Sequence, residues 1–214
     1  MTPLTPDALA AGLLSTGAVK LQPHDPFTWS SGLKAPIYCD NRQLLGLPEL
    51  RTRIADALAE AAKAHHPSLI AGTSTAGIPW GALVAERLDL PFAYVRPEPK
   101  KHGMGRQVEG PNAKNHRVVL IEDLLSTGGS SLKCVKAVRE EGGVVATVLA
   151  LFSYGLEVAT DAFAEADLKP QVLCTFEDLS AVAQAEGHLD GAGRASLFDW
   201  QMDPQSWSQA RGGA

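Results

Sequence analysis

Short runs of apolar residues recur along most of the chain, and segments of helical period separate several of them. The apolar runs occupy residues 69–72, 92–95, 118–121 and 144–152. Strands that lack polar residues are buried on both faces, as in a mostly parallel sheet covered by helices on both sides. Such sheets bind ligands at the carboxyl ends of their strands. The pattern therefore predicts an α/β fold with a central, mostly parallel sheet, and a functional site in the loops that follow these runs.

Three parts of the chain depart from this alternation. Residues 19–40 combine short strand-like pieces with turns, which predicts a small appendage. Residues 97–115 form a long segment with glycines and basic residues, and a loop of this length inside a compact domain is usually functional. Residues 191–214 are rich in Gly, Ala, Gln and Ser, and we expect a frayed end with one docked turn. We predict a single domain over residues 1–190 and a C-terminal tail over 191–214.

Composition and charge exclude several classes of protein. The chain is 45% hydrophobic and 20% charged, which is ordinary for a folded globular protein. No apolar run approaches the roughly 20 residues that span a bilayer, and the N-terminus lacks a signal-peptide pattern. Three widely spaced cysteines indicate reduced thiols in the cytoplasm rather than a disulfide or zinc framework. The net charge of -5 favours neither nucleic acid nor membrane partners, so an anionic substrate would need a local cluster of positive charge.

The segment 118–131, VVLIEDLLSTGGSS, carries the clearest chemical signal. A buried strand ends at Glu122 and Asp123, whose carboxylates suit sugar hydroxyls or hydrated Mg²⁺. The turn that follows offers hydroxyls and backbone N–H groups at a helix N-terminus, a good site for phosphate. The segment therefore predicts a ribose 5-phosphate site. It has neither the lysine of a Walker A loop nor the GxGxxG of dinucleotide binders. A solvated acid pair before an ordinary helix cap remains an alternative on this segment alone.

This segment resembles the signature with which type I phosphoribosyltransferases bind phosphoribosyl pyrophosphate (PRPP). Segments 27–42, 71–79 and 94–110 resemble, in order, the hood, the pyrophosphate loop and the mobile catalytic loop of orotate phosphoribosyltransferases. Residues 152–156 fit the family's segment after the next strand. The resemblance implies the type I phosphoribosyltransferase fold, with a hood mainly from residues 17–45. It also implies transfer of ribose 5-phosphate from PRPP to orotate, which gives orotidine 5′-monophosphate and pyrophosphate in de novo pyrimidine (UMP) biosynthesis.

The resemblance also implies roles for individual residues. Lys100, His102 and Asp123 would be catalytic, and Tyr38, Cys39 and Ser126 would lie against orotate. The residues implied to contact PRPP are Arg96, Lys100, His102, Thr73, Ser74, Thr75, Glu122, Asp123, Leu124, Leu125, Ser126, Thr127, Gly128, Gly129 and Ser130. Mg²⁺ would be bridged through PRPP rather than held directly by protein side chains. The catalytic loop would reach the neighbouring subunit's site, which implies a homodimer.

The residue types of segment 96–110 suit this chemistry. Breaking the anomeric bond leaves positive charge on the ribose and negative charge on the departing pyrophosphate. A loop that carries Lys100, Lys101, His102 and Arg106 can stabilise the leaving group and exclude water when it closes. His102 could also donate a proton to the pyrophosphate. This segment supplies the local positive charge that an acidic protein needs.

Some positions depart from the pattern of other family members. Pro97, Ala76 and Ser30 stand where some relatives have lysine, and residues 153–156 lack an arginine that some use for the orotate carboxylate. Arg42 is our substitute candidate for that carboxylate. Two alternatives remain: a purine phosphoribosyltransferase of the same fold, and a non-catalytic PRPP-binding transcriptional regulator. The hood argues against the first, and the catalytic loop argues against the second.

Overall fold

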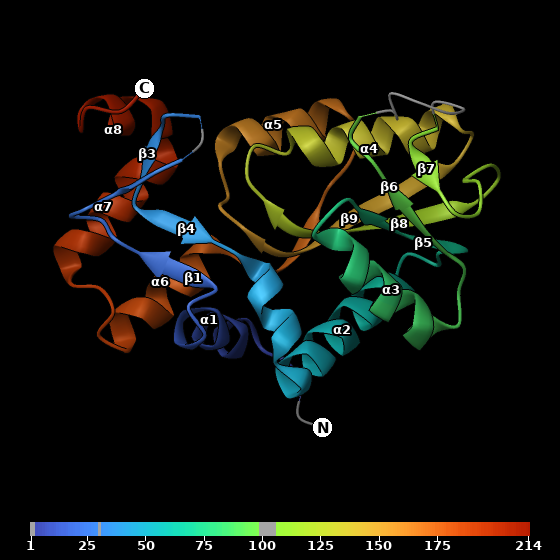
Figure 1. The fold of residues 1–214 in the computed structure, drawn as a ribbon, viewed down its shortest axis with the longest axis horizontal. Helices are drawn as coiled ribbons and strands as arrows, with labels where there is room; N and C mark the ends of the chain where they lie inside the picture. The colour runs from blue at the N-terminus through green and yellow to red at the C-terminus, as the bar shows by residue number, and fades with distance from the viewer. Residues whose placement is uncertain (1–2, 30, 99–105) are drawn as a thin grey trace.

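A six-stranded sheet forms the centre of the protein (Figure 1). The computed structural model describes residues 3–29, 31–98 and 106–214. The sheet order is β10-β9-β8-β5-β6-β7, with parallel pairing throughout except between β6 and β7. This arrangement confirms the predicted mostly parallel sheet. The strands are β5 (Leu69–Thr73), β6 (Phe92–Val95), β7 (Val108–Glu109), β8 (Arg117–Leu125), β9 (Val144–Ser153) and β10 (Gln171–Cys174).

Helices cover both faces of the sheet, so the apolar strands are buried on both sides. Side chains of β8 alternate between two hydrophobic clusters: Val119 and Ile121 belong to one, Val118 and Leu120 to the other. In Figure 1, α2 and α3 lie on one side of the sheet and α4 and α5 on the other. In the part of the chain that the structure describes, no helix is long and apolar enough to span a membrane. The helices are α1 (Pro6–Ser15), α2 (Pro48–Lys63), α3 (Gly77–Leu88), α4 (Gly129–Glu140), α5 (Glu157–Glu165) and α6 (Phe176–Ala185).

The hood consists of two short antiparallel ribbons, as the sequence predicts. Strand β1 (Val19–Leu21) pairs with β4 (Ile37–Cys39), and β2 (Phe27–Thr28) pairs with β3 (Lys34–Ala35). A 3-10 helix, η1 (Asn41–Gly46), then leads into α2. Two-residue strands are too short to be stable alone. The hood therefore depends on what packs against it.

The C-terminal segment supplies that support, so our expectation of a frayed end is wrong. It forms α7 (Gly191–Met202) and α8 (Pro204–Gln209), and Figure 1 shows both beside the hood. The Lys34 N–H donates to Ser208 Oγ at 2.8 Å, and the Ala214 N–H donates to the Gly32 carbonyl at 3.0 Å. Aspartate caps begin both helices, and two tryptophans, Trp200 and Trp207, are buried. These caps and this apolar burial outweigh the polar composition of the segment.

Strand β8 continues past the point where the sequence predicts its end. The sequence predicts a strand that ends at the acid pair, Glu122 and Asp123, yet the ladder with β9 continues to Leu125, which lies opposite Ser153. Glu122 lies opposite Ala150 within this ladder. Glu and Asp are poor strand formers, and here the hydrogen-bonded partner strand overrides that preference. The acid pair therefore belongs to the rigid sheet rather than to a loop.

Helix α3 lies unusually close to the sheet, because three positions at the contact are glycine. A Cβ atom on Gly72 would lie 2.6 Å from the Gly77 carbonyl oxygen, and one on Gly81 would lie 3.0 Å from the Gly72 Cα. A Cβ atom on Gly77 would lie 2.5 Å from Thr73 Oγ1 and would also overlap the Ile121 carbonyl oxygen. These contacts fix the start of α3 against the ends of β5 and β8.

We therefore predict that Gly77→Ala destabilises the protein. The added methyl group meets backbone atoms that cannot move independently, so we expect a loss of about 2 kcal/mol in the free energy of unfolding. For a chain of this size that corresponds to a fall in Tm of about 4–8 °C, measured by thermal unfolding. Gly191→Ala is the matched control, because Gly191 also begins a helix and nothing lies within 4 Å of its added Cβ. Equal Tm values for the two variants would contradict the close packing.

Candidate active site

The pyrophosphate-loop segment and the signature strand meet at the carboxyl edge of the sheet. Gly72 of β5 lies opposite Ile121 of β8, and Thr73 Oγ1 donates to the Ile121 carbonyl at 3.2 Å. The Ser74 N–H donates to the Val95 carbonyl at 2.8 Å, and the Ser74–Thr75 peptide bond is cis. The structure thus brings together two segments that the sequence separates by about fifty residues, as expected for ends of adjacent parallel strands.

The two carboxylates of the acid pair have different environments. Glu122 is 6% exposed, and its Oε2 accepts a hydrogen bond from Ser131 Oγ at 2.7 Å. Its Oε1 accepts from the Asp123 N–H at 3.1 Å. Burial, and then the negative charge of Glu122, raise the pKa of Asp123 to about 7. Ser131 of α4 therefore holds Glu122 in place. A bound cation, or a hydroxyl group that donates to Asp123, would favour the ionised form of Asp123.

Asn41 connects the acid pair to the hood. Its side chain is fully buried, and its Nδ2 donates to the Asp123 carbonyl at 2.7 Å. Its Oδ1 accepts a hydrogen bond from the Cys39 thiol at 3.2 Å. A buried amide with both ends engaged has one orientation available. Asn41 thereby fixes the end of β4, which carries Tyr38 and Cys39, relative to Asp123.

The turn from Ser126 to Ser130 has the geometry of an anion site. Gly128 has a φ of +79°, and a Cβ atom there would lie 2.9 Å from the Phe163 ring, so glycine suits this position. Helix α4 begins at Gly129, and no side chain among the described residues caps its N-terminus. The first N–H groups of the helix therefore lack intrahelical partners and are directed toward the turn.

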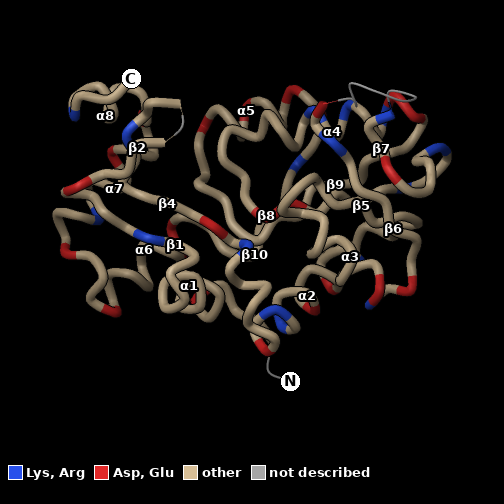
Figure 2. Tube along the Cα trace, viewed as in Figure 1, with Lys and Arg blue, Asp and Glu red and all other residues tan. Residues whose placement is uncertain are grey.

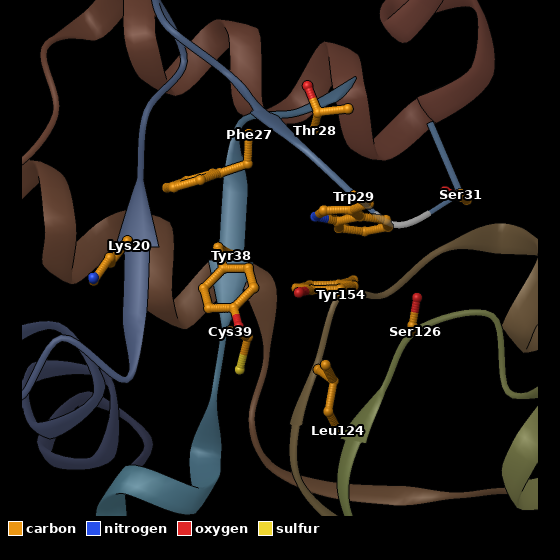
Figure 3. Close-up of a pocket in the computed structure, with 10 residues that line it drawn as sticks. All are labelled: Lys20, Phe27, Thr28, Trp29, Ser31, Tyr38, Cys39, Leu124, Ser126 and Tyr154. Atoms are coloured by element: carbon orange, nitrogen blue, oxygen red, sulfur yellow. The ribbon is translucent and has the colours of Figure 1, made fainter. Parts of the chain in front are cut away.

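A cavity of about 830 Å³ lies between the hood and the end of β8. Figure 3 shows Trp29 and Tyr154 as nearly parallel rings near Ser126. Of the residues proposed to contact orotate, the cavity wall includes Tyr38, Cys39 and Ser126. The complete wall is Lys20, Phe27, Thr28, Trp29, Ser31, Tyr38, Cys39, Leu124, Ser126 and Tyr154.

Sequence reasoning missed most of the aromatic part of this wall. Trp29 and Tyr154 come from segments noted for resemblance, but only their packing against each other makes them wall residues. Arg42, the proposed carboxylate partner, is not among the residues that line the cavity. It forms an ion pair with Asp40 at 2.6 Å. Its role in orotate binding stays a prediction.

Lys100 and His102, which we predict to be catalytic, lie outside the described residues. The stems of their segment are joined by two hydrogen bonds, from the Arg96 N–H to the Gln107 carbonyl at 2.9 Å and from Gln107 Nε2 to the Arg96 carbonyl at 2.9 Å. Among the described residues, no carboxylate lies within ion-pair distance of the Arg96 side chain, so its guanidinium is available to an anion.

Other cations near these stems are already paired. Figure 2 shows Lys and Arg next to Asp and Glu around α4 and β7. Arg106 contacts Glu141 at 3.3 Å, and Lys133 contacts Glu98 at 2.5 Å. Our prediction that Arg106 adds free positive charge to the loop does not match this pairing. In the part of the chain that the structure describes, no group of three or more His, Cys, Asp or Glu residues could hold a metal ion.

Comparison with known proteins agrees with this geometry. The family model of the phosphoribosyl transferase domain matches residues 40–161. The orotate phosphoribosyltransferase of Bacillus caldolyticus is 51% identical over 201 residues, which cover 93% of this chain and 97% of the relative. That of Streptococcus pneumoniae (strain D39) is 47% identical over 203 residues, which cover 94% and 97%.

A solved structure adds the same result at the level of the fold. The crystal structure of orotate phosphoribosyltransferase from Aeropyrum pernix superimposes with a TM-score of 0.72 at 33% sequence identity, covering 85% of this chain and 99% of that one. Family model, sequence relatives and fold agree over most of the chain. The chain belongs to the phosphoribosyltransferase family and, within it, to the orotate phosphoribosyltransferases.

Proposed function

We propose that this protein transfers ribose 5-phosphate from PRPP to orotate, giving orotidine 5′-monophosphate and pyrophosphate in pyrimidine biosynthesis. The observation that carries the proposal is that Ser126 belongs to two sites at once. It begins the anion-binding turn, and it also lines the aromatic cavity beside Tyr38 and Cys39. A sugar phosphate on the turn and a flat base in the cavity would therefore meet at the end of β8. That is the arrangement that transfer of a sugar to a base requires.

The ribose phosphate is bound by the end of β8 and the turn that follows. The N–H groups at the start of α4 and the hydroxyls of Ser126, Thr127 and Ser130 suit the 5-phosphate. The carboxylate of Asp123 accepts hydrogen bonds from the ribose hydroxyls. Glu122 acts on the ribose site without contacting the ribose, because its own oxygens are engaged by Ser131 and by the Asp123 N–H. Both acids thus serve the ribose site, one by contact and one by its charge and position.

The pyrophosphate is bound by the loop between β5 and α3 and by the cationic segment. Thr73, Ser74 and Thr75 form this loop, in which Thr73 Oγ1 and the Ser74 N–H hold the ends of the strands. Arg96 offers a guanidinium that forms no ion pair with any described carboxylate. Lys100 and His102 complete the site when their loop closes. Because negative charge grows on the pyrophosphate as the anomeric bond breaks, cations that arrive on closure act mainly on the transition state. A closed loop also excludes water, which would otherwise hydrolyse PRPP.

Mg²⁺ fits this site as an ion that the substrate itself binds. Its ligands would be oxygens of PRPP and water, since Mg²⁺ dehydrates reluctantly and binds substrate phosphates, and Asp123 would act on it only through the ribose hydroxyls. When bound, Mg²⁺ neutralises part of the pyrophosphate charge. The protein's own residues then orient the ribose, hold the leaving group and exclude water. We also propose that the enzyme is cytoplasmic, since its three thiols are free.

The proposed function is tested by the absorbance of orotate. Purified protein with PRPP and Mg²⁺ should consume orotate and release pyrophosphate in equal amounts. Removal of Mg²⁺ with EDTA should stop the reaction, and added Mg²⁺ should restore it. Faster consumption of hypoxanthine, adenine or xanthine would instead assign the protein to purines. PRPP binding without consumption of any base would indicate a regulator.

Asp123 should give the reaction an acidic pH limb. Because its pKa is raised to about 7 in the free protein, the carboxyl group becomes protonated as the pH falls below that value and no longer accepts hydrogen bonds from ribose. We expect kcat/KM for PRPP to fall tenfold per pH unit below about pH 7. Asp123→Asn should be poorly active at every pH and should lack this limb. A limb that persists in Asp123→Asn would assign it to another group.

The same shift has a consequence for stability. A carboxyl group with a raised pKa in the folded state favours the folded state when protonated, and this contribution is lost as the pH rises through about 7. Asp123→Asn should therefore raise Tm at pH 8 by more than at pH 5. The exposed Asp161 provides a control, since Asp161→Asn should leave Tm unchanged at both pH values.

Lys100 should act on turnover far more than on substrate binding. We expect Lys100→Ala to lower kcat by about 100-fold or more, while KM for PRPP changes by less than about fivefold. Lys136→Ala serves as the control, because Lys136 is an exposed lysine of α4 that pairs with Glu140. An unchanged kcat for Lys100→Ala would remove Lys100 from its catalytic role.

The same variant tests whether the loop is shared between subunits of a homodimer. Lys100→Ala and Asp123→Asn chains should each have little activity alone. If the loop of one subunit completes the site of the other, a mixed dimer contains one site with both native residues. Random reassortment of equal amounts should then restore about a quarter of wild-type activity. No recovery on mixing would mean that each subunit completes its own site.

A further inference from the structure

The orotate carboxylate needs a partner that the sequence does not identify. Arg42 is engaged by Asp40 and does not line the cavity. Lys20 is the one cation among the lining residues, and Figure 3 shows it at the opposite end of the wall from Ser126. Residues 153–156, where some family members place an arginine, contain Tyr154, which does line the cavity.

Tyr154 is held firmly at the end of β9. Its N–H donates to the Leu125 carbonyl at 3.0 Å, and its carbonyl accepts from Gln201 Nε2 at 2.7 Å. Its ring is stacked with Trp29, with centroids 5.8 Å apart and planes at 21°. The edge of Trp200 contacts it at a centroid distance of 5.4 Å. The orientation of the ring is therefore fixed by the sheet, the hood and the C-terminal helices together.

Within residues 3–29, 31–98 and 106–214, the hydroxyl of this ring has no hydrogen-bond partner. Tyr154 is 3% exposed, yet none of the described residues forms a hydrogen bond with its oxygen. Figure 3 shows the oxygen directed into the cavity, toward Tyr38 and away from Ser126. A hydroxyl that faces a binding cavity and has no protein partner is normally satisfied by ligand or water.

The hydroxyl can act only as a neutral group in this setting. Burial, followed by the charges of Cys39 and Asp123, raises the pKa of Tyr154 far above its ordinary value. The phenol therefore keeps its proton across the physiological range. A protonated phenol that lacks an acceptor suits an anionic oxygen better than a second donor.

We propose that the Tyr154 hydroxyl donates a hydrogen bond to the carboxylate of orotate and is the residue that selects the acidic base. This inference rests on the proposed function. A neutral donor replaces the cation that some family members use, so the contact gives less affinity but depends on an exact orientation of the ring. Trp29 and Gln201 supply that orientation and are positioning residues for the base site.

Tyr154→Phe removes only the oxygen and is the central experiment. We expect KM for orotate to rise about tenfold. The kcat and the KM for PRPP should stay within about twofold of the wild-type values, and Tm within about 2 °C. Tyr94→Phe is the matched control, because Tyr94 lies on β6 and does not line the cavity. Uracil, which has the same ring without the carboxylate, is used as a competitive inhibitor, and its Ki should be the same for Tyr154→Phe and wild type.

Each other outcome overturns the inference. A wild-type KM for orotate in Tyr154→Phe would exclude the contact. An equal rise in the Ki of uracil would mean that the hydroxyl binds the ring rather than the carboxylate. If KM for orotate rises more in Lys20→Met or Arg42→Met than in Tyr154→Phe, that cation rather than Tyr154 binds the carboxylate of orotate. Failure of the proposed function is recognised separately, because the wild-type protein itself would then consume no orotate.

Discussion

The contact between α3 and the ends of β5 and β8 determines the geometry of the whole site. Gly72 and Gly77 let the helix approach until its first residue touches the Ile121 carbonyl, one position before the acid pair. The loop that precedes α3 is thereby pressed against the strand that carries Glu122 and Asp123. Because this contact is made of backbone atoms in a buried sheet, it is stiff. A pyrophosphate group and a ribose bound at these two places would be held at a fixed separation, which is what an ordered displacement at the anomeric carbon requires.

The same rigidity explains the unequal roles of the two acids. Glu122 accepts a hydrogen bond from Ser131 of α4. The carboxyl group of Asp123 lies beside that of Glu122, whose negative charge adds to the effect of burial. Holding two carboxylates this close in a buried strand disfavours ionisation of Asp123, and a ligand that brings positive charge or hydroxyl donors relieves that cost. The ionised form of Asp123 is thus less favourable without substrate than with it. Substrate binding and the ionisation of Asp123 are therefore coupled.

The sequence predicts the sheet well, because it depends on local patterns. Apolar runs locate the strands, and the Gly-rich turn after Asp123 locates the start of α4. The base side is harder, since Trp29 and Tyr154 are about 125 positions apart and become neighbours only through tertiary packing. Arg42 illustrates the difficulty: its position next to Tyr38 and Cys39 suggests the base, but Asp40 is two residues away and engages it. Likewise, composition describes the C-terminal segment as polar, while the burial of Trp200 and Trp207 decides its structure.

This division has a physical basis in how the two halves of the site are built. The PRPP half lies on strands that hydrogen-bond to one another along their whole length, and few substitutions there would preserve its geometry. The base half is formed by hood strands of two or three residues, which the C-terminal helices hold through Ser208 and Trp200, and by Tyr154, which Gln201 holds. Contacts of this kind are side-chain contacts between separate elements, which tolerate change more easily than a backbone ladder.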